Sequence, residues 1–179
     1  PIVVCDDDFD GVVTFDLTDS VNQILAGQPG FTATVHVTED DANAGQNAID
    51  DITAFVSGTQ IIYVRAFEAD SPECYSLATI SITVNPRPEV FAADDYVLCD
   101  DNGAGDGVEV FDLTTKTDEI TGGDATYIVS YYTTQADAEA ANNPINLPGS
   151  YTNTTPWAQE IFVRAETAEG CISTTSFNL

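Results

Sequence analysis

The stretch CDDDFDGVVTFDLT (5–18) decides how this chain is organised, because a second version, CDDNGAGDGVEVFDLT, occupies residues 99–114. Both stretches begin C-D-D, continue through D-G-V and end F-D-L-T, and the second has two additional residues before its D-G pair. Self-similarity at a fixed period is the sequence signature of a chain built from repeated structural units. The 179 residues are therefore predicted to contain two copies of one module.

Three further blocks recur in the same order. They pair VHVTEDDANAGQNAI (35–49) with SYYTTQADAEAANNPI (130–145), IIYVRAFEADSPEC (61–74) with EIFVRAETAEGC (160–171), and LATISI (77–82) with TTSFNL (174–179). The boundary between the copies lies in Val84-Asn-Pro-Arg-Pro-Glu89, where two prolines favour an extended, semi-rigid linker. We therefore expect domains at 1–86 and 87–179, within a longer array of modules.

The charge balance is strongly acidic in both copies. The chain has 30 Asp and Glu residues against 4 Lys and Arg, which gives a net charge of −26. Residues 1–88 carry 14 acidic and 2 basic side chains, and residues 89–179 carry 16 and 2. Such a surface repels nucleic acid and anionic membranes, and no apolar run is long enough to cross a bilayer. We expect neither nucleic-acid binding nor membrane insertion.

β-branched and aromatic residues in period-two alternation dominate both copies, which is typical of strands. Strands are predicted at 2–4, 11–17, 31–38, 52–56, 60–67 and 76–84, and at 96–98, 108–113, 126–133, 150–152, 159–166 and 172–179. Helical turns are predicted at 19–26, 39–44 and 134–141, with Thr38 and Thr134 as N-caps. In F-D-L, Phe15 and Leu17 should face the core and Asp16 should face outward. Short strands at this density predict an all-β fold of two tandem immunoglobulin-like β-sandwich modules.

The first acidic loop, Asp6–Gly11, contains the pattern D-x-D-x-D-G. Alternate carboxylates in this pattern can converge on one hard cation, and the glycine permits the sharp turn. The glutamate and flanking helices of a complete EF-hand are missing, so we expect a calcium-binding loop between two strands. Its predicted ligands are Asp6, Asp8, Asp10 and Asp16, and a carboxylate from the turn at 68–73 is an alternative to Asp16.

The second acidic loop has a longer spacing between its carboxylates. Its predicted Ca²⁺ ligands are Asp100, Asn102, Asp106 and Asp112. For both loops the alternative is a polar turn in which side-chain oxygens accept hydrogen bonds from nearby backbone amides. For the whole surface, the alternative to bound cations is a solvated acidic coat that aids solubility.

Four cysteines occur as two matched pairs, which favours disulfides made outside the cytosol. The repeat selects one of the three possible connectivities, Cys5–Cys74 and Cys99–Cys171. The first bond would close a loop of about 70 residues and contribute roughly 4 kcal/mol in the chain-entropy model.

Two arginines, Arg65 and Arg164, are the basic residues that recur inside the repeated blocks. We predict that each pairs with a repeated carboxylate, Asp16 or Asp112. The alternative is an exposed arginine without a fixed partner.

No arrangement of residues predicts catalysis. The single histidine, His36, has Tyr132 as its counterpart in the second copy, which speaks against a nucleophile triad. Paired carboxylates permit glycosidase chemistry, but no insertion that could form a pocket accompanies them, so we predict no enzyme and no catalytic residues. Trp157 could stack on a sugar ring or pack against its own module.

Two short motifs suggest glycosylation. Asn153-Thr-Thr is an N-glycosylation triplet, and Ser20 lies in the D-S-small-apolar pattern that Bacteroidetes use for O-glycosylation of secreted proteins.

Taken together, C-D-D-D-x-D-G-x-x-x-F-D-L, the T-x-x-D-A block and I-Y-V-R-A…C resemble the tandem repeats of very large Bacteroidetes cell-surface proteins. These are similar to adhesin-like proteins exported by the type IX secretion system and linked to gliding and attachment. The resemblance covers both copies and implies an immunoglobulin-like fold, a secreted or cell-surface location, and a stalk or adhesive role. The second copy departs from the pattern at the spacing of its acidic loop.

We therefore expect an extracellular structural or adhesive repeat, stabilised by Ca²⁺, within a long surface stalk or fibre. The expected partners are neighbouring repeats of the same chain or fibre, together with surface glycans or proteins. The alternative function is a carbohydrate-binding module of a secreted multidomain protein.

Overall fold

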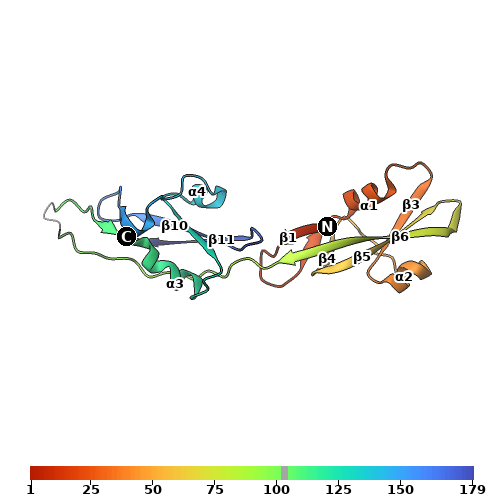
Figure 1. The fold of residues 1–179 in the computed structure, drawn as a ribbon, viewed down its shortest axis with the longest axis horizontal. Coiled ribbons are helices and arrows are strands. Elements are labelled where there is room, and N and C mark those ends of the chain that lie inside the picture. Colours follow the sequence, from red (N-terminus) through yellow and green to blue (C-terminus); the bar gives the residue numbers. More distant parts are fainter. Residues whose placement is uncertain (102–104) are drawn as a thin grey trace. The chain divides into compact units, whose positions relative to one another are not determined.

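The computed structural model describes residues 1–101 and 105–179. The chain forms two compact units, Pro1–Pro86 and Arg87–Leu179 (Figure 1). Asn102, a predicted ligand of the second acidic loop, lies outside the described residues.

Unit 1 is built on one mixed sheet. Its elements are β1 (Ile2–Cys5), β2 (Val13–Phe15), α1 (Thr18–Leu25), β3 (Phe31–His36), α2 (Glu39–Ala44), β4 (Phe55–Ser57), β5 (Gln60–Glu68) and β6 (Ser71–Asn85). The main sheet has the strand order β1-β6-β5-β3, and β2 and β4 form a separate two-stranded ladder. The β1–β6 pairing is parallel, whereas β5 pairs antiparallel with both β3 and β6.

Unit 2 repeats this plan in a shorter form. Its elements are β7 (Val110–Phe111), the 3-10 helix η1 (Leu113–Lys116), α3 (Thr117–Thr121), β8 (Ile128–Tyr132), α4 (Gln135–Ala140), the 3-10 helix η2 (Pro148–Ser150), β9 (Tyr151–Thr152), β10 (Glu160–Glu166) and β11 (Ile172–Asn178). The main sheet has the order β11-β10-β8, with a second ladder of β7 and β9. Where unit 1 has β1, the Tyr96 backbone N–H of unit 2 donates to the Asn178 carbonyl at 2.8 Å.

The predicted pair of immunoglobulin-like β-sandwiches is wrong, because each unit is a mixed α/β structure. A sandwich needs a second extended sheet packed on the first. Here the segments after F-D-L, and those after β3 in unit 1 and β8 in unit 2, form helices instead. The helix starts have a local cause: Thr38 accepts a hydrogen bond from the Asp41 N–H and Thr134 accepts one from the Asp137 N–H, so both predicted N-caps are confirmed. Within the described residues, a two-stranded ladder is what remains beside each main sheet.

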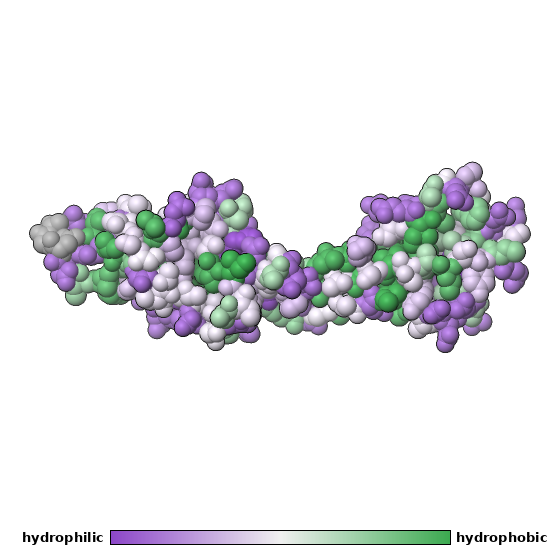
Figure 2. All heavy atoms as spheres, viewed as in Figure 1, coloured by the Kyte–Doolittle hydropathy of each residue, from purple (hydrophilic) through white to green (hydrophobic). Residues whose placement is uncertain are grey.

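The F-D-L motif anchors both cores. Phe15 and Leu17 are 3% and 0% exposed, whereas Asp16 lies at the surface. The expected orientation of this motif is therefore confirmed. Its counterparts Phe111 and Leu113 are buried in the same way. Hydrophilic side chains cover much of the surface visible in Figure 2, in keeping with the net charge of −26.

Candidate cross-linking and cation sites

The described residues contain one disulfide, and it differs from both predicted bonds. Cys5 and Cys171 are disulfide-bonded, whereas Cys74 and Cys99 are exposed free thiols. The predicted pairs Cys5–Cys74 and Cys99–Cys171 are therefore wrong. The bond joins a residue of unit 1 to a residue of unit 2.

Strand geometry within unit 1 separates Cys5 from Cys74. Cys5 lies beside Asn85 in the parallel β1–β6 register, whereas Cys74 stands 11 positions earlier on β6. A strand advances about 3.3 Å per residue, so these positions are roughly 36 Å apart. A disulfide requires Cα atoms within about 7 Å. A bond inside unit 1 is thus excluded.

In unit 2, Cys99 and Cys171 are likewise separated along a strand. Cys171 directly precedes the seven-residue strand β11, and Tyr96 is bonded to Asn178 at the opposite end of that strand. The strand covers roughly 23 Å, and the three residues from Tyr96 to Cys99 reach only about 10 Å. Each module therefore carries one cysteine at each of its two ends.

The linker explains why Cys5 finds Cys171. Cys5 lies next to Asn85, the residue before Pro-Arg-Pro. In unit 2, the Arg87 Nε donates to the Ser173 Oγ at 3.0 Å, two residues from Cys171. Consecutive Cα atoms are about 3.8 Å apart, so Asn85 and Arg87 lie within roughly 8 Å of each other. Both cysteines thus belong to the ends that the linker joins.

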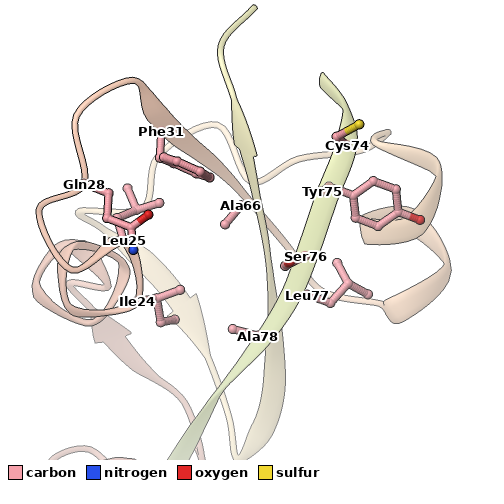
Figure 3. Close-up of a pocket in the computed structure, with 10 residues that line it drawn as sticks. All are labelled: Ile24, Leu25, Gln28, Phe31, Ala66, Cys74, Tyr75, Ser76, Leu77 and Ala78. Atoms are coloured by element: carbon pink, nitrogen blue, oxygen red, sulfur yellow. The ribbon is translucent and has the colours of Figure 1, made fainter. Parts of the chain in front are cut away.

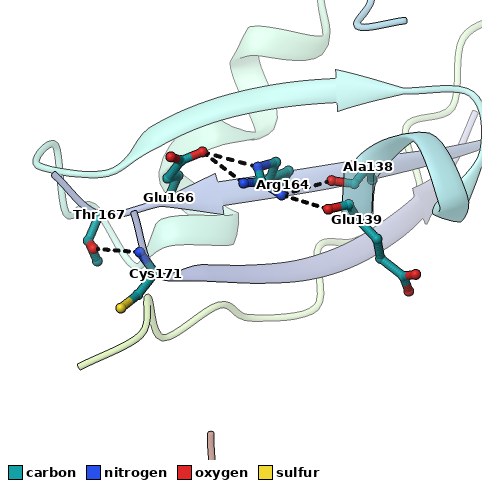
Figure 4. A network of polar contacts seen from close by, with 6 residues as sticks. All are labelled: Ala138, Glu139, Arg164, Glu166, Thr167 and Cys171. Atoms are coloured by element: carbon teal, nitrogen blue, oxygen red, sulfur yellow. Dashed lines mark hydrogen bonds and ion pairs between the residues drawn. The ribbon is translucent and has the colours of Figure 1, made fainter. Parts of the chain in front are cut away.

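Cys171 is held by the turn that precedes β11. Its backbone N–H donates to the Thr167 Oγ1 at 3.2 Å (Figure 4), and its carbonyl accepts from the Thr167 N–H at 2.9 Å. The turn passes through Gly170, whose φ of 86° suits glycine. These two hydrogen bonds with Thr167 hold the backbone of Cys171 in the turn.

Tryptic digestion without reduction should reveal this connectivity directly. Trypsin cuts after Arg65, Lys116 and Arg164, and Pro88 protects the bond after Arg87. We expect peptide 1–65 to appear linked to peptide 165–179 by mass spectrometry. The free cysteines Cys74 and Cys99 should both appear in an unlinked peptide 66–116. A linkage of 66–116 to either of the other two cysteine-containing peptides would contradict the structure.

The first acidic loop closes on the side chain of Asp6. Its Oδ1 accepts from the backbone N–H groups of Asp8 and Phe9 at 3.3 and 3.0 Å, and its Oδ2 accepts from Gly11 at 2.8 Å. Burial acts to raise the pKa of Asp6, but these amides outweigh it and the net pKa is lowered. Gly11 ends the loop at φ 79°, a backbone conformation that glycine adopts without strain.

The second acidic loop repeats the closing bond. Asp100, the counterpart of Asp6, accepts the Gly107 N–H through Oδ2 at 2.7 Å, and Gly107 has φ 73°. The other oxygen of this carboxylate, Oδ1, is buried and has no hydrogen-bond partner among the described residues. In each loop, the first aspartate after the cysteine thus accepts the hydrogen bond that closes the loop.

The predicted ligands of the first loop are only partly brought together. Carboxylate oxygens of Asp6, Asp7 and Asp8 lie within 4.8 Å of one another. Asp7 was not predicted, and the run of three aspartates was the available signal. Asp10 instead accepts from the Val12 N–H at 2.8 Å, and Asp16 accepts from Thr18 at 2.9 Å. Neither belongs to the group of three.

The pKa of Asp8 reflects the neighbouring carboxylates of this loop. The Asp10 N–H acts to lower the pKa of Asp8, but desolvation and the charge of Asp10 act against it, and the net pKa is raised. In the second loop, Asp106 accepts from the Val108 N–H at 3.0 Å. Asp112 accepts from the Thr114 N–H at 3.1 Å and begins η1. The hydrogen-bonded polar turn is therefore realised in both loops.

Asp6→Asn should lower the melting temperature of unit 1 by several degrees at pH 7, because either orientation of the amide leaves at least one loop N–H without an acceptor. A lowered folded pKa contributes stability that is present above the ordinary value of 3.8 and lost as pH falls below it. The difference between variant and wild type should accordingly shrink in acid. Asp10→Asn is the control, because its remaining oxygen can still accept from Val12. Equal melting curves for Asp6→Asn and wild type at pH 7 would contradict this role.

The repeated arginines bind helix ends rather than carboxylates of F-D-L. The Arg65 Nη1 donates to the carbonyls of Ala42 and Asn43 at the end of α2, at 2.9 and 2.7 Å. Arg164 donates to the Glu139 carbonyl of α4 at 2.9 Å and forms an ion pair with Glu166 (Figure 4). Both sequence interpretations of these arginines are wrong. The similar spacing between the helix block and V-R-A in the two copies was the signal that could have revealed the contact.

The remaining predicted residues have structural surroundings. Asn153 is 6% exposed, and its Nδ2 donates to the carbonyls of Gly107 and Thr155. A glycan on this nitrogen would displace these bonds, so the triplet serves the fold. Ser20 lies half-buried on α1. His36 is fully buried, with ring nitrogens bonded to Gln46 and Thr34.

Trp157 is 71% exposed and rests on the acidic loop of unit 2. Its ring lies against Gly107, where an added Cβ would come within 2.5 Å of the indole. The backbone N–H of Trp157 donates to the Gly107 carbonyl at 3.0 Å. The close contact accounts for glycine at this position, while most of the Trp157 surface stays exposed.

Among the described helices, none has the length and apolar character needed to cross a bilayer. The disulfide indicates an extracytoplasmic location, since such bonds persist in oxidising compartments.

No curated protein matches the chain. The family model described as the Flavobacterium inter-domain disulphide bond domain matches twice, over residues 1–88 and 95–179. The two matches coincide with the two repeats, and the observed bond connects one to the other. The chain therefore belongs to the family of Flavobacterium inter-domain disulphide bond domains and carries two copies of that domain.

Proposed function

We propose that the chain is a structural segment of a bacterial surface stalk, in which disulfides tie each module to its neighbour. The observation that carries this proposal is the Cys5–Cys171 bond. It adds a second covalent connection between modules that the linker already joins. This role requires only the folded modules and their cysteines.

The two free cysteines fit the same role. Cys74 is the counterpart of Cys171, and Cys99 is the counterpart of Cys5. Both are exposed, and each stands at the end of its unit opposite to the bonded cysteine. In a longer array, Cys74 forms a disulfide with the first cysteine of the preceding module. Cys99 forms one with the last cysteine of the following module.

A chain of four modules tests the proposal. It is made from two copies of this chain joined through a copy of residues 83–94, because Leu179 is the counterpart of Ile82. After air oxidation and tryptic digestion, we expect the two copies of peptide 66–116 to be linked to each other, through Cys99 of the first copy and Cys74 of the second. Two free thiols should remain, one at each end of the array.

Cys99→Ser in the first copy is the matched control. It removes the central bond and should leave both Cys5–Cys171 bonds intact. Four free thiols in the parent array after complete oxidation would overturn the proposal.

Calcium stabilisation is a separate part of the proposed role. Its support is the group of Asp6, Asp7 and Asp8 oxygens and the buried Oδ1 of Asp100, which has no partner among the described residues. These are hard oxygen donors of the kind that calcium prefers. Bound calcium would also relieve the repulsion within a chain of net charge −26.

Calcium is expected to raise the melting temperature of the chain relative to chelator. A cation at ten times its dissociation constant stabilises the folded state by about 1.4 kcal/mol, and extracellular sites bind at about 10⁻⁴ to 10⁻³ M. Calorimetry at millimolar calcium, with magnesium as a comparison, measures the shift. Asp7→Asn with Asp8→Asn should remove it from unit 1, since the amide oxygen introduced at position 8 can still accept the Asp10 N–H. Equal melting with calcium and chelator would reject the site.

Carbohydrate binding is the second candidate, because the exposed side chain of Trp157 offers a stacking surface. Binding to a panel of surface glycans that Trp157→Ala abolishes would favour it. Binding that persists in the variant would dissociate it from this residue.

A further inference from the structure

In unit 2, the segment that follows the linker lies across the surface between α3 and the edge strand β11. The Ser173 Oγ at the start of β11 donates to the Pro88 carbonyl at 2.6 Å. The Phe91 N–H donates to the Ile120 carbonyl at 2.9 Å. The Tyr96 N–H reaches Asn178 at the far end of the strand. Residues 88–96 thus run along the whole strand, with Val90 and Ala93 packed against the core.

Unit 1 has a groove at the equivalent place. It has a volume of about 500 Å³ and runs between the end of α1 and the first half of β6 (Figure 3). Its lining residues are Ile24, Leu25, Gln28, Phe31, Ala66, Cys74, Tyr75, Ser76, Leu77 and Ala78. β1 pairs with β6 only from Ile82 onward, so no described strand lies beside the outer edge of this part of β6. A second hollow, lined by Pro1, Gln23 and Ile24 among others, extends the surface toward the start of β1.

The groove residues of unit 1 correspond to the covered residues of unit 2. Ser76 and Ile24 are the counterparts of Ser173 and Ile120, which bind the segment in unit 2. Gln23 is the counterpart of Glu119, whose side chain accepts the Asp94 N–H. The anchoring groups are therefore present in unit 1: a serine hydroxyl at position 76, a backbone carbonyl at position 24 and a side-chain oxygen acceptor at position 23.

The groove residues of unit 1 are more exposed than their counterparts in unit 2. This is the difference expected if unit 1 lacks the segment that covers these residues in unit 2. Ile120 and Thr121 are 0% and 4% exposed in unit 2, and Ala165 is fully buried. Their counterparts Ile24, Leu25 and Ala66 are only half-buried in unit 1. The surface that residues 88–94 close in unit 2 is open in unit 1.

We propose that the groove of unit 1 is the docking site for an extended segment of the type Pro-Glu-Val-Phe-Ala-Ala, supplied by the linker of a module ahead of it. Pro1 is the counterpart of Asp95, so the counterpart of residues 88–94 would stand directly before Pro1. The source of the segment rests on the proposed tandem arrangement. Cys74 lines the groove as a free thiol, so the groove is present without a disulfide at this end.

One position of the groove, Ala26, affects how closely an aromatic side chain can approach. The Phe91 ring lies over Gly122, where an added Cβ would be 2.9 Å from the ring. The counterpart in unit 1 is Ala26, which carries that Cβ at φ 49°. An aromatic residue docked there must shift by a few tenths of an ångström. Ala26→Gly should therefore strengthen docking.

The test extends the full chain at its N-terminus with PRPEVFAAD, a copy of residues 86–94 placed before Pro1. A control extension carries serine at the positions copied from Val90 and Phe91. Amide hydrogen exchange followed by mass spectrometry or NMR reports on α1 and β6. We expect roughly tenfold slower exchange around Leu25 and Ser76 in the extended chain than in the control, together with a higher melting temperature of unit 1.

Two groove variants make the result specific. Leu25→Asp places a charge in the groove and should abolish the difference between extension and control, whereas Ala26→Gly should enlarge it. Equal exchange in the extended and control chains would overturn the proposal, and so would protection that survives Leu25→Asp. A dimer of the unextended chain that depends on Leu25 would also overturn it, because a second copy would then be the occupant. Since no step uses a cysteine, failure here leaves the disulfide proposal standing, and the converse also holds.

Discussion

Arg65→Ala is expected to lower the free energy of unfolding of unit 1 by about 2–4 kcal/mol. The side chain is 8% exposed, and its guanidinium donates to carbonyls at the end of α2 and to the Pro72 carbonyl at 2.9 Å. It also stacks on Tyr75, with the guanidinium carbon 3.6 Å from the ring centroid. Alanine would leave these carbonyls without their donor and open a cavity. Urea unfolding followed by amide exchange in unit 1 measures the loss.

Two variants locate the cause. Arg65→Lys keeps the charge but has a single nitrogen, which cannot reach all three carbonyls, so it should recover only part of the stability. Arg164→Ala should destabilise unit 2 and leave unit 1 unchanged, with a smaller effect because Arg164 is less buried. Full recovery by lysine would show that charge alone matters and would contradict the assigned contacts.

Removing the disulfide, by Cys5→Ser together with Cys171→Ser, is expected to cost about 5 kcal/mol in complete unfolding of the chain. The bond closes a loop of about 165 residues, and a loop of this length strongly restricts the unfolded ensemble in the chain-entropy model. The double variant avoids leaving a new free thiol at this end. Urea unfolding with and without reductant gives the comparison, because reduced wild type should behave like the variant.

The matched control for this change is Cys74→Ser with Cys99→Ser. It removes the free thiols and should alter stability by less than about 0.5 kcal/mol, as expected for surface positions. If the two double variants unfold at the same urea concentration, the bond does not constrain the chain.

The repeat itself, the buried face of F-D-L and the threonine caps could be predicted from sequence, because each depends on local spacing. The disulfide could not, because a bond within each module and a bond between modules obey the same repeat. What separates them is the direction of β1, which runs parallel to β6 and carries Cys5 away from Cys74. Strand direction depends on long-range pairing that period-two alternation does not encode.

The acidic loops illustrate a second limit. A run of aspartates predicts oxygen donors but not what they bind, since the same carboxylate can hold a cation or accept backbone amides. Asp6 does the latter through three hydrogen bonds. Sequence spacing also did not reveal the local role of Asp16 and Asp112, which lie in F-D-L and accept the amide two residues later, at the start of a helix.

The Cys5–Cys171 bond turns most of the chain into a closed ring. If a protease cuts the backbone once at any place between these two residues, the fragments stay in one molecule until the bond is reduced. Under the proposed bonding of Cys99 to a following module, a second ring begins at Cys99 and overlaps the first between residues 99 and 171. An array of such overlapping rings would survive a single cut anywhere in its interior, so that length is retained even where the environment is rich in proteases.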